Sequence, residues 1–186
     1  MLAAARELLA EGETPTVEQS AERAAISRTT AYRYFPNQRA LLIASYPELG
    51  APSLLDSEVP ADPVARLELV TESIMRQVLE HEPELRATLR LSLEAPPPSP
   101  ETLPLRQGRA ISWIEDALAP LRERIAEPEL HRFALAIRAT LGIEALVWLT
   151  DVGGLSRDEA ADLMRSSART LLRSALGEAA PTDGSV

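Results

Sequence analysis

The stretch of sequence that decides the fold runs from residue 16 to residue 42 and reads TVEQSAERAAISRTTAYRYFPNQRALL. Thr16 and Ser27 each precede a helical run, and Thr and Ser are preferred N-cap residues. Pro36 ends the second run, because proline cannot continue a helix. The pattern therefore predicts two short helices joined by a tight turn, at residues 17–24 and 28–34.

The second of these helices carries the chemistry that a DNA-reading helix needs. Its cap and first turn hold small polar residues and one arginine: Ser27, Arg28, Thr29 and Thr30. A helix that enters the major groove contacts base edges with such N-terminal residues, and arginine can donate two hydrogen bonds to guanine. Tyr32, Arg33 and Tyr34 follow with donors suited to phosphate oxygens. The alternative interpretation is an ordinary helical hairpin with exposed arginine and tyrosine.

The charge distribution favours one basic face on an acidic protein. The net charge of −9 at first argues against a nucleic-acid partner. Residues 1–46, however, carry five Arg and five Glu, whereas residues 47–186 carry 14 Arg and 23 acids. Residues 26–40 contain three arginines and no acid. We therefore expect the acidic surface to repel DNA and the stretch at 26–40 to be the one place where DNA can approach.

The rest of the chain predicts an all-α protein with no strand pattern. Apolar residues make up 45% of the 186 residues and aromatic residues 4%, so Leu, Ala, Ile and Val form the core. We expect a linker at 47–62 and a proline-rich loop at 95–104. The expected helices lie at 2–11, from 38 to about 46, from 63 to about 80, at 84–93, at 111–125 with a break at Pro120, at 128–152 and at 156–176. The expected division is a head at 1–46 and a helical body at 47–186.

The run at 128–152 is apolar nearly all round, which predicts a helix buried on several sides. Candidate ligand-binding residues lie on it and on the preceding helices: Met75, Trp113, Phe133, Thr140, Glu144 and Trp148. Plain core packing explains the apolar members equally well. Glu144 would be costly to bury alone, so it either pairs with an arginine or meets a cationic ligand.

Several functional classes find no support in the sequence. The absence of cysteine excludes disulfides, thiolate metal sites and a cysteine nucleophile. No Ser-His-acid arrangement, glycine-rich phosphate loop or paired-carboxylate motif indicates an enzyme. His81 and His131 do not have metal-ligand spacing, so we expect neither metal nor cofactor. There is no signal pattern and no charge-free apolar run near 20 residues, so we expect a cytoplasmic protein outside the membrane.

The stretch ISRTTAYRYFPNQRALL, from residue 26, resembles the DNA-binding head of the tetracycline-repressor (TetR) family. The resemblance covers about 45 residues. It implies phosphate contacts from Thr16, Tyr32, Tyr34 and Gln38, and contacts with bases or nearby phosphates from Arg28, Thr29 and Thr30. Four positions depart from the family pattern and predict modest DNA affinity: Ser20 and Ala31 replace larger apolar residues, Ala25 replaces glycine, and Gln38 replaces lysine.

The resemblance implies a transcriptional regulator, typically a repressor that a small-molecule inducer releases from a palindromic operator in double-stranded DNA. It also implies a homodimer formed through the last two helices, at about 129–152 and 156–176. The alternative function is a helical small-molecule carrier with weak or lost DNA binding. Neither the effector nor the operator follows from the residues.

Overall fold

The computed structural model describes residues 1–45, 52–56, 58–94 and 108–178. The chain divides into two compact units. The first, which we call the head unit, comprises residues 1–50 and 81–107, and the second, the body unit, comprises residues 51–80 and 108–186. The described residues of both units are helical and contain no strand, which confirms the predicted all-α class. The predicted loop at 95–104, residue 46 and part of the predicted linker lie outside the described residues.

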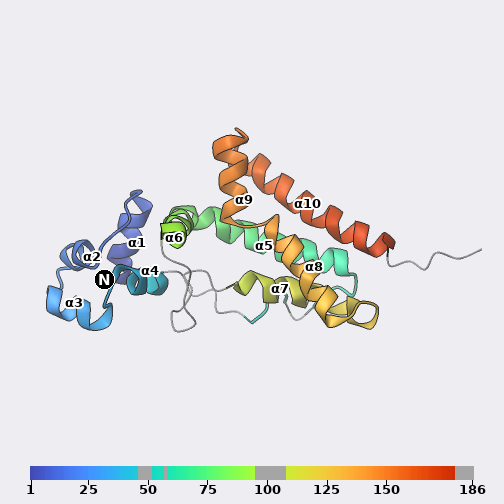
Figure 1. Cartoon of the computed structure of the whole chain (residues 1–186), viewed down its shortest axis with the longest axis horizontal. Helices are drawn as coiled ribbons and strands as arrows, with labels where there is room; N and C mark the ends of the chain where they lie inside the picture. The colour runs from blue at the N-terminus through green and yellow to red at the C-terminus, as the bar shows by residue number, and fades with distance from the viewer. Residues whose placement is uncertain (46–51, 57, 95–107, 179–186) are drawn as a thin grey trace, which may run out of the picture. The chain divides into compact units, whose positions relative to one another are not determined.

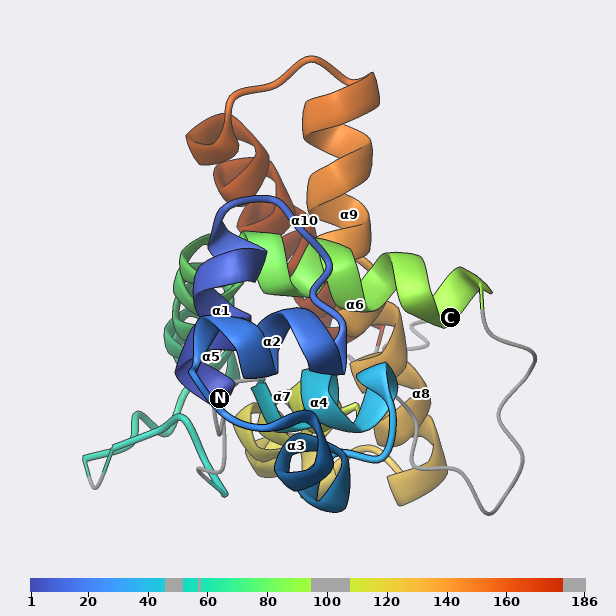
Figure 2. The same cartoon turned by 90° about the vertical axis from the view of Figure 1, so that its left-hand side faces the viewer.

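The head unit is built from short helices (Figure 2). Its described helices are α1 (Leu2–Ala10), α2 (Val17–Arg23), α3 (Arg28–Tyr34), α4 (Gln38–Ser45) and α6 (Glu82–Glu94). Thr16 caps α2 in a capping box with Gln19, and Ser27 caps α3. The two caps supply acceptors for amide groups that a helix leaves unpaired at its start, so they set where α2 and α3 begin.

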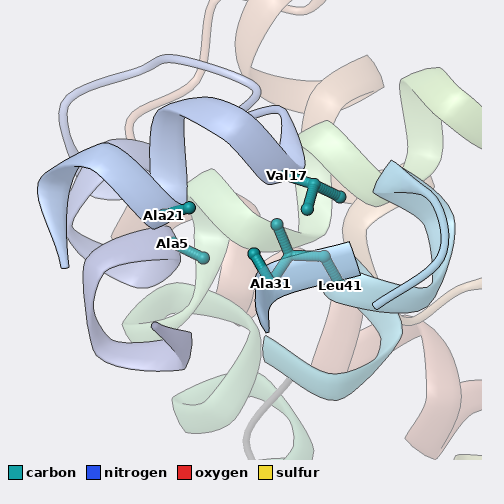
Figure 3. Packing of buried hydrophobic residues seen from close by; sticks show 5 residues of the cluster. All are labelled: Ala5, Val17, Ala21, Ala31 and Leu41. Carbon is teal, nitrogen blue, oxygen red and sulfur yellow. The ribbon is translucent and has the colours of Figure 1, made fainter. Parts of the chain in front are cut away.

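Small side chains form the core that holds the first four helices together (Figure 3). One cluster contains Ala5, Val17, Ala21, Ala31 and Leu41, each almost completely buried. Because three of these five are alanines, the helix backbones must approach closely for the cluster to be filled. Ala31 is the only buried residue of α3, so this helix turns one side toward the core and its other side chains remain at the surface.

Helix α6 packs against the head rather than standing apart from it. Leu9 of α1 and Leu42 of α4 form a second buried cluster with Ala87 of α6, and Leu91 packs against it. Arg90 of α6 donates a hydrogen bond to Thr14 in the connection before α2. The compact unit that contains the head thus includes a helix that the expected division at residue 46 assigned to the body.

The body unit is a bundle of helices around α5 (Figure 1). Within it, α5 packs against α7 and α10, and α7 packs against α8. The described elements are α5 (Pro63–Glu80), α7 (Arg109–Ala117), the 3-10 helix η1 (Ala119–Glu123), α8 (Glu127–Ala139), α9 (Ile143–Val147), the π-helical turn η2 (Trp148–Val152) and α10 (Arg157–Glu178). The predicted break near Pro120 and the capping box at the start of α10 are both present.

The prediction of one continuous helix over 128–152 is wrong, because the chain breaks at residues 140–142 between α8 and α9. Gly142 has a φ of 101°, a conformation that L side chains rarely adopt. The guanidinium of Arg138 folds back over this glycine and donates to the carbonyl of Leu141. The break therefore depends on the missing side chain at residue 142.

The expectation that this segment is buried on several sides is also wrong. Leu135 is exposed on α8, and Trp148 in η2 is 64% exposed. By length and composition alone, Glu127–Val152 is apolar enough to cross a membrane, but the core helix of a soluble protein meets the same criterion. One third of its most apolar window is buried inside the protein. The segment therefore combines a buried side with an apolar side that nothing in the described residues covers.

Candidate nucleic-acid interface

The surface of α3 carries nearly all of the predicted DNA-contacting residues. With Ala31 directed into the core, the remaining side chains of the helix and its cap are exposed. These exposed residues are Ser27, Arg28, Thr29, Thr30, Tyr32, Arg33 and Tyr34. Such a helix meets the first requirement for reading DNA, because its polar side chains are available to a partner without any unfolding of the head.

The first turn of α3 is organised by its cap. The Ser27 hydroxyl accepts a hydrogen bond from the Thr30 amide at 3.2 Å and shares another with the Thr30 hydroxyl at 2.8 Å. Arg28 and Thr29 lie beside this cap and are exposed. The cap thus holds Ser27 and Thr30 in place, and Arg28 is the longest side chain of the turn.

The last turn of α3 presents a cation and two phenol groups. The guanidinium of Arg33 lies over the ring of Tyr34, 5.3 Å from its centroid, and also donates to the Tyr34 hydroxyl at 3.3 Å. Both side chains are exposed, and they hold each other in a defined position. A guanidinium beside a phenol hydroxyl is a suitable arrangement for binding phosphate oxygens.

Tyr32 is held from the neighbouring helix. Its hydroxyl donates a short hydrogen bond to the carboxylate of Glu18, the second residue of α2. This hydrogen bond lowers the pKa of Glu18 and raises the pKa of Tyr32, since it stabilises the charged carboxylate and the neutral phenol. Sequence reasoning did not include Glu18 in the interface, because no local pattern links two residues that lie 14 positions apart.

Thr16 and Gln38 have clear structural partners in the head. The Thr16 hydroxyl accepts from the Gln19 amide at 3.1 Å. The Gln38 side-chain amide donates to the carbonyl groups of Thr14 and Pro15, at 3.2 and 3.0 Å. Gln38 therefore fastens the start of α4 to the connection before α2. A phosphate contact from either residue remains a prediction.

The turn between α2 and α3 contains the departure from glycine that the sequence indicated. Ala25 has a φ of 54°, in the left-handed region. The amide of Ala25 donates to Glu22 O at 3.1 Å and the amide of Ile26 donates to Ala21 O at 2.8 Å. These two bonds define a Schellman motif, which requires a left-handed residue at this position. The motif sets the direction in which α3 leaves α2.

The six candidate ligand-binding residues differ in burial, and their role in binding a ligand remains a prediction. Met75 and Trp113 are buried, Phe133, Thr140 and Glu144 are half-buried, and Trp148 is exposed. A groove of about 370 Å³ between α5 and α10 includes Met75 and none of the other five. The residues that line this groove are Glu72, Met75, Arg76, Leu79, Asp158, Ala161, Asp162 and Arg165.

Glu144 has an arginine partner. Its carboxylate lies 3.7 Å from the guanidinium of Arg138, across the break between α8 and α9. The predicted arginine partner is therefore present, and contact of Glu144 with a cationic ligand remains a prediction. His131, by comparison, lies 2.5 Å from the Glu115 carboxylate on the neighbouring helix α7. Among the residues that the structure describes, no group of three His, Asp or Glu side chains is placed to hold a metal ion.

Comparison with known proteins identifies the part of the chain just described. Residues 1–45 match the family model described as bacterial regulatory proteins, tetR family. The match includes α1 to α4 and therefore the whole exposed surface of α3. Among curated proteins, none matches the chain.

Proposed function

We propose that this chain, whose residues 1–45 are a TetR-family DNA-binding domain, is a dimeric repressor that a small molecule releases from its operator. The domain implies DNA binding and a role in regulating transcription, and regulators of this family are typically not enzymes. The observation that carries the proposal is the exposed polar surface of α3, whose one buried residue is Ala31. Because such a regulator acts on chromosomal DNA, we expect it inside the cell.

Two copies of the head would bind a palindromic operator. In helix-turn-helix dimers the recognition helices contact half-sites about one helical turn of DNA apart. Within each half-site, Arg28 is the candidate for a bidentate contact with guanine, and the threonines of the first turn are suited to thymine methyl groups. Tyr32, Arg33 and Tyr34 would contact phosphates, which position the helix without reading sequence.

Exposed apolar side chains near the end of the chain support dimerisation. Trp148 and Val152 of η2 are each 64% exposed, and Leu163 of α10 is 44% exposed. These elements pack against each other within the body unit. Large apolar side chains grouped at a surface are typical of subunit interfaces. The interface we propose thus uses the segment 129–152, in its two helical pieces, together with α10.

Oligomeric state tests this part directly. We expect Leu163→Glu to weaken the dimer in sedimentation equilibrium, since a carboxylate buried at an interface without a partner is unfavourable. Leu93→Glu is the matched control, because Leu93 is 78% exposed in the head unit. A wild-type monomer at high protein concentration, or equal behaviour of the two variants, would contradict the proposed interface.

Release by an effector requires coupling between two sites. The dimer would have one conformation whose two heads match the spacing of the half-sites and one whose heads do not. An inducer must bind the second conformation more tightly than the first. A coupling of about 1–3 kcal/mol, or roughly 5- to 150-fold in operator affinity, is typical of such linkage. The candidates for contact with this ligand remain Met75, Trp113, Phe133, Thr140, Glu144 and Trp148.

The decisive experiment is DNA binding measured as a function of salt. An inverted repeat in the DNA upstream of the gene is the first operator to test. The logarithm of the affinity should fall with the logarithm of salt concentration, with a slope close to the number of phosphates contacted. The alternative function, a helical carrier with weak or lost DNA binding, predicts no specific shift at any salt concentration.

Two substitutions separate the roles on α3. Tyr34→Phe should weaken binding to all sequences alike, because we assign its hydroxyl to a DNA phosphate, which carries no sequence information. Arg28→Ala should cost about 1–3 kcal/mol and also relax the preference at one operator position. Equal losses on operator and on random DNA for both variants would refute the assigned roles.

A further inference from the structure

The contact between Glu18 and Tyr32 joins the two helices of the DNA-binding motif. Glu18 lies at the start of α2, and Tyr32, which is 41% exposed, lies on α3. The hydrogen bond between them dominates and leaves the pKa of Tyr32 raised, but the positive charge of Arg28 also acts on both groups and favours their deprotonated forms. The Glu18 carboxylate therefore lies near Arg28 and Tyr32, two of the side chains to which the proposed function assigns contacts with DNA.

The Glu18 carboxylate is ionised near neutral pH. The hydrogen bond from Tyr32 is the largest cause of its lowered pKa, and the nearby Arg28 adds to the effect. A phenol has one hydrogen to donate. While that hydrogen is shared with Glu18, it is not available to a phosphate.

We propose that Glu18 competes with the DNA backbone for Tyr32 and thereby lowers the affinity of the head for any duplex. This inference rests on the proposed function, because it concerns the same DNA-binding surface. On binding, a phosphate oxygen replaces the carboxylate as the acceptor of the Tyr32 hydroxyl, and the negative charge of Glu18 remains nearby. Both effects act on the backbone, so they are independent of base sequence.

The size of the effect follows from the charge. Two unit charges about 4–6 Å apart in water repel enough to change an equilibrium by roughly three- to fivefold. Freeing the hydroxyl adds to this. We therefore expect removal of the whole carboxylate, as in Glu18→Ala, to raise affinity about three- to tenfold at low salt. The gain should shrink as salt screens the repulsion.

The test compares Glu18→Gln with Glu13→Gln in the full-length chain, using a random-sequence duplex as the probe. Both variants change the net charge by one, and Glu13 is an exposed carboxylate of the head whose charge acts on Arg23. Glu18→Gln removes the charge but keeps an acceptor oxygen, so it should gain about three- to fivefold in affinity, and Glu13→Gln should change affinity less than about twofold. Unchanged or weaker binding by Glu18→Gln overturns the proposal, because Glu18 would then orient Tyr32 for DNA rather than oppose it.

A double-mutant cycle tests the competition for the hydroxyl itself. Tyr32→Phe should cost little affinity in the wild-type background, where the hydroxyl is held by Glu18. It should cost more in the Glu18→Ala background, where the hydroxyl is released to the phosphate. Additive effects of the two substitutions would overturn the competition.

A titration without DNA separates this proposal from the proposed function. The chain has three tyrosines, and the absorbance of tyrosinate at alkaline pH reports their titration. Glu18→Gln should lower the pKa of the one tyrosine that Tyr32→Phe removes from the titration. An unchanged titration refutes the contact. A shifted titration in a chain that binds no duplex at any salt refutes the DNA-binding function, and the competitor role with it.

Discussion

Replacing Ala25 with glycine should stabilise the head, although it removes a methyl group. Ala25 is exposed and has a φ of 54°, at the left-handed position of the Schellman motif that ends α2. A residue with a Cβ pays about 1–2 kcal/mol in this region, because the Cβ approaches the following carbonyl oxygen. Glycine adopts the same conformation without that contact.

The magnitude follows from two opposing terms. Relief of the steric cost favours the variant by about 1–2 kcal/mol. The greater flexibility of glycine in the unfolded chain opposes it by about 0.5–1 kcal/mol. The net expectation is a gain of about 0.5–1 kcal/mol, or roughly 2–8 °C in the melting temperature of a unit of this size.

Hydrogen exchange measured on the α2–α3 segment is the appropriate assay, because it reports opening of the head separately from the body unit. Ala24→Gly is the matched control. Ala24 neighbours Ala25, but its φ of −86° lies in a region that alanine adopts without strain. Glycine at residue 24 should therefore destabilise the head by about 0.5–1 kcal/mol. The reasoning is refuted if both substitutions destabilise the segment, or if Ala25→Gly leaves its exchange unchanged.

Three further predictions concern stability. Ser20→Ala should stabilise the head by about 1 kcal/mol in urea unfolding, since the Ser20 hydroxyl is fully buried with no hydrogen-bond partner among the described residues. A loss of stability would indicate a missed partner. Gly142→Ala should destabilise the body unit by about 1–3 kcal/mol, because φ at residue 142 is 101° and the new Cβ would lie 2.5 Å from the Arg138 guanidinium. Tryptophan fluorescence follows the unfolding of this unit alone, since both tryptophans lie in it. Wild-type stability in the variant would contradict the proposed strain. Hydrogen bonds from Ser156 lower the pKa of Glu159, so their contribution to the free energy of unfolding is present above pH 4.5, the ordinary pKa, and is lost as pH falls through the lower pKa of the folded state. Glu159→Gln should therefore flatten the acid side of a stability–pH profile measured down to about pH 3. An unchanged profile would exclude this cap as a source of the pH dependence.

Local chemistry made the head predictable. Thr16 and Ser27 begin helices because their hydroxyls accept amide hydrogens, and Pro36 and Gly12 end or separate them through their backbone restrictions. These effects act over three or four residues, so they can be read from sequence without knowledge of the fold. The exposure of α3 followed from the same pattern, because Ala31 is the one apolar residue between polar neighbours.

The body was predicted less well, because its apolar residues carry little directional information. The run from 128 to 152 is consistent with one helix buried all round, and Gly142 within it was the available signal of a break. Whether a glycine interrupts a helix depends on what packs there. In this protein the side chain of Arg138 occupies the space beside Gly142 and pairs with Glu144.

The sequence by itself determined the elements of the head, the caps that start them and the polar composition of the helix offered to DNA, since each depends on interactions between near neighbours along the chain. Only the tertiary structure decided that α6 joins the head through Leu9, Leu42 and Ala87, and that Glu18 holds Tyr32. Contacts between distant residues depend on the directions in which helices leave their turns. Those directions arise from packing as a whole, and no short stretch of sequence contains them.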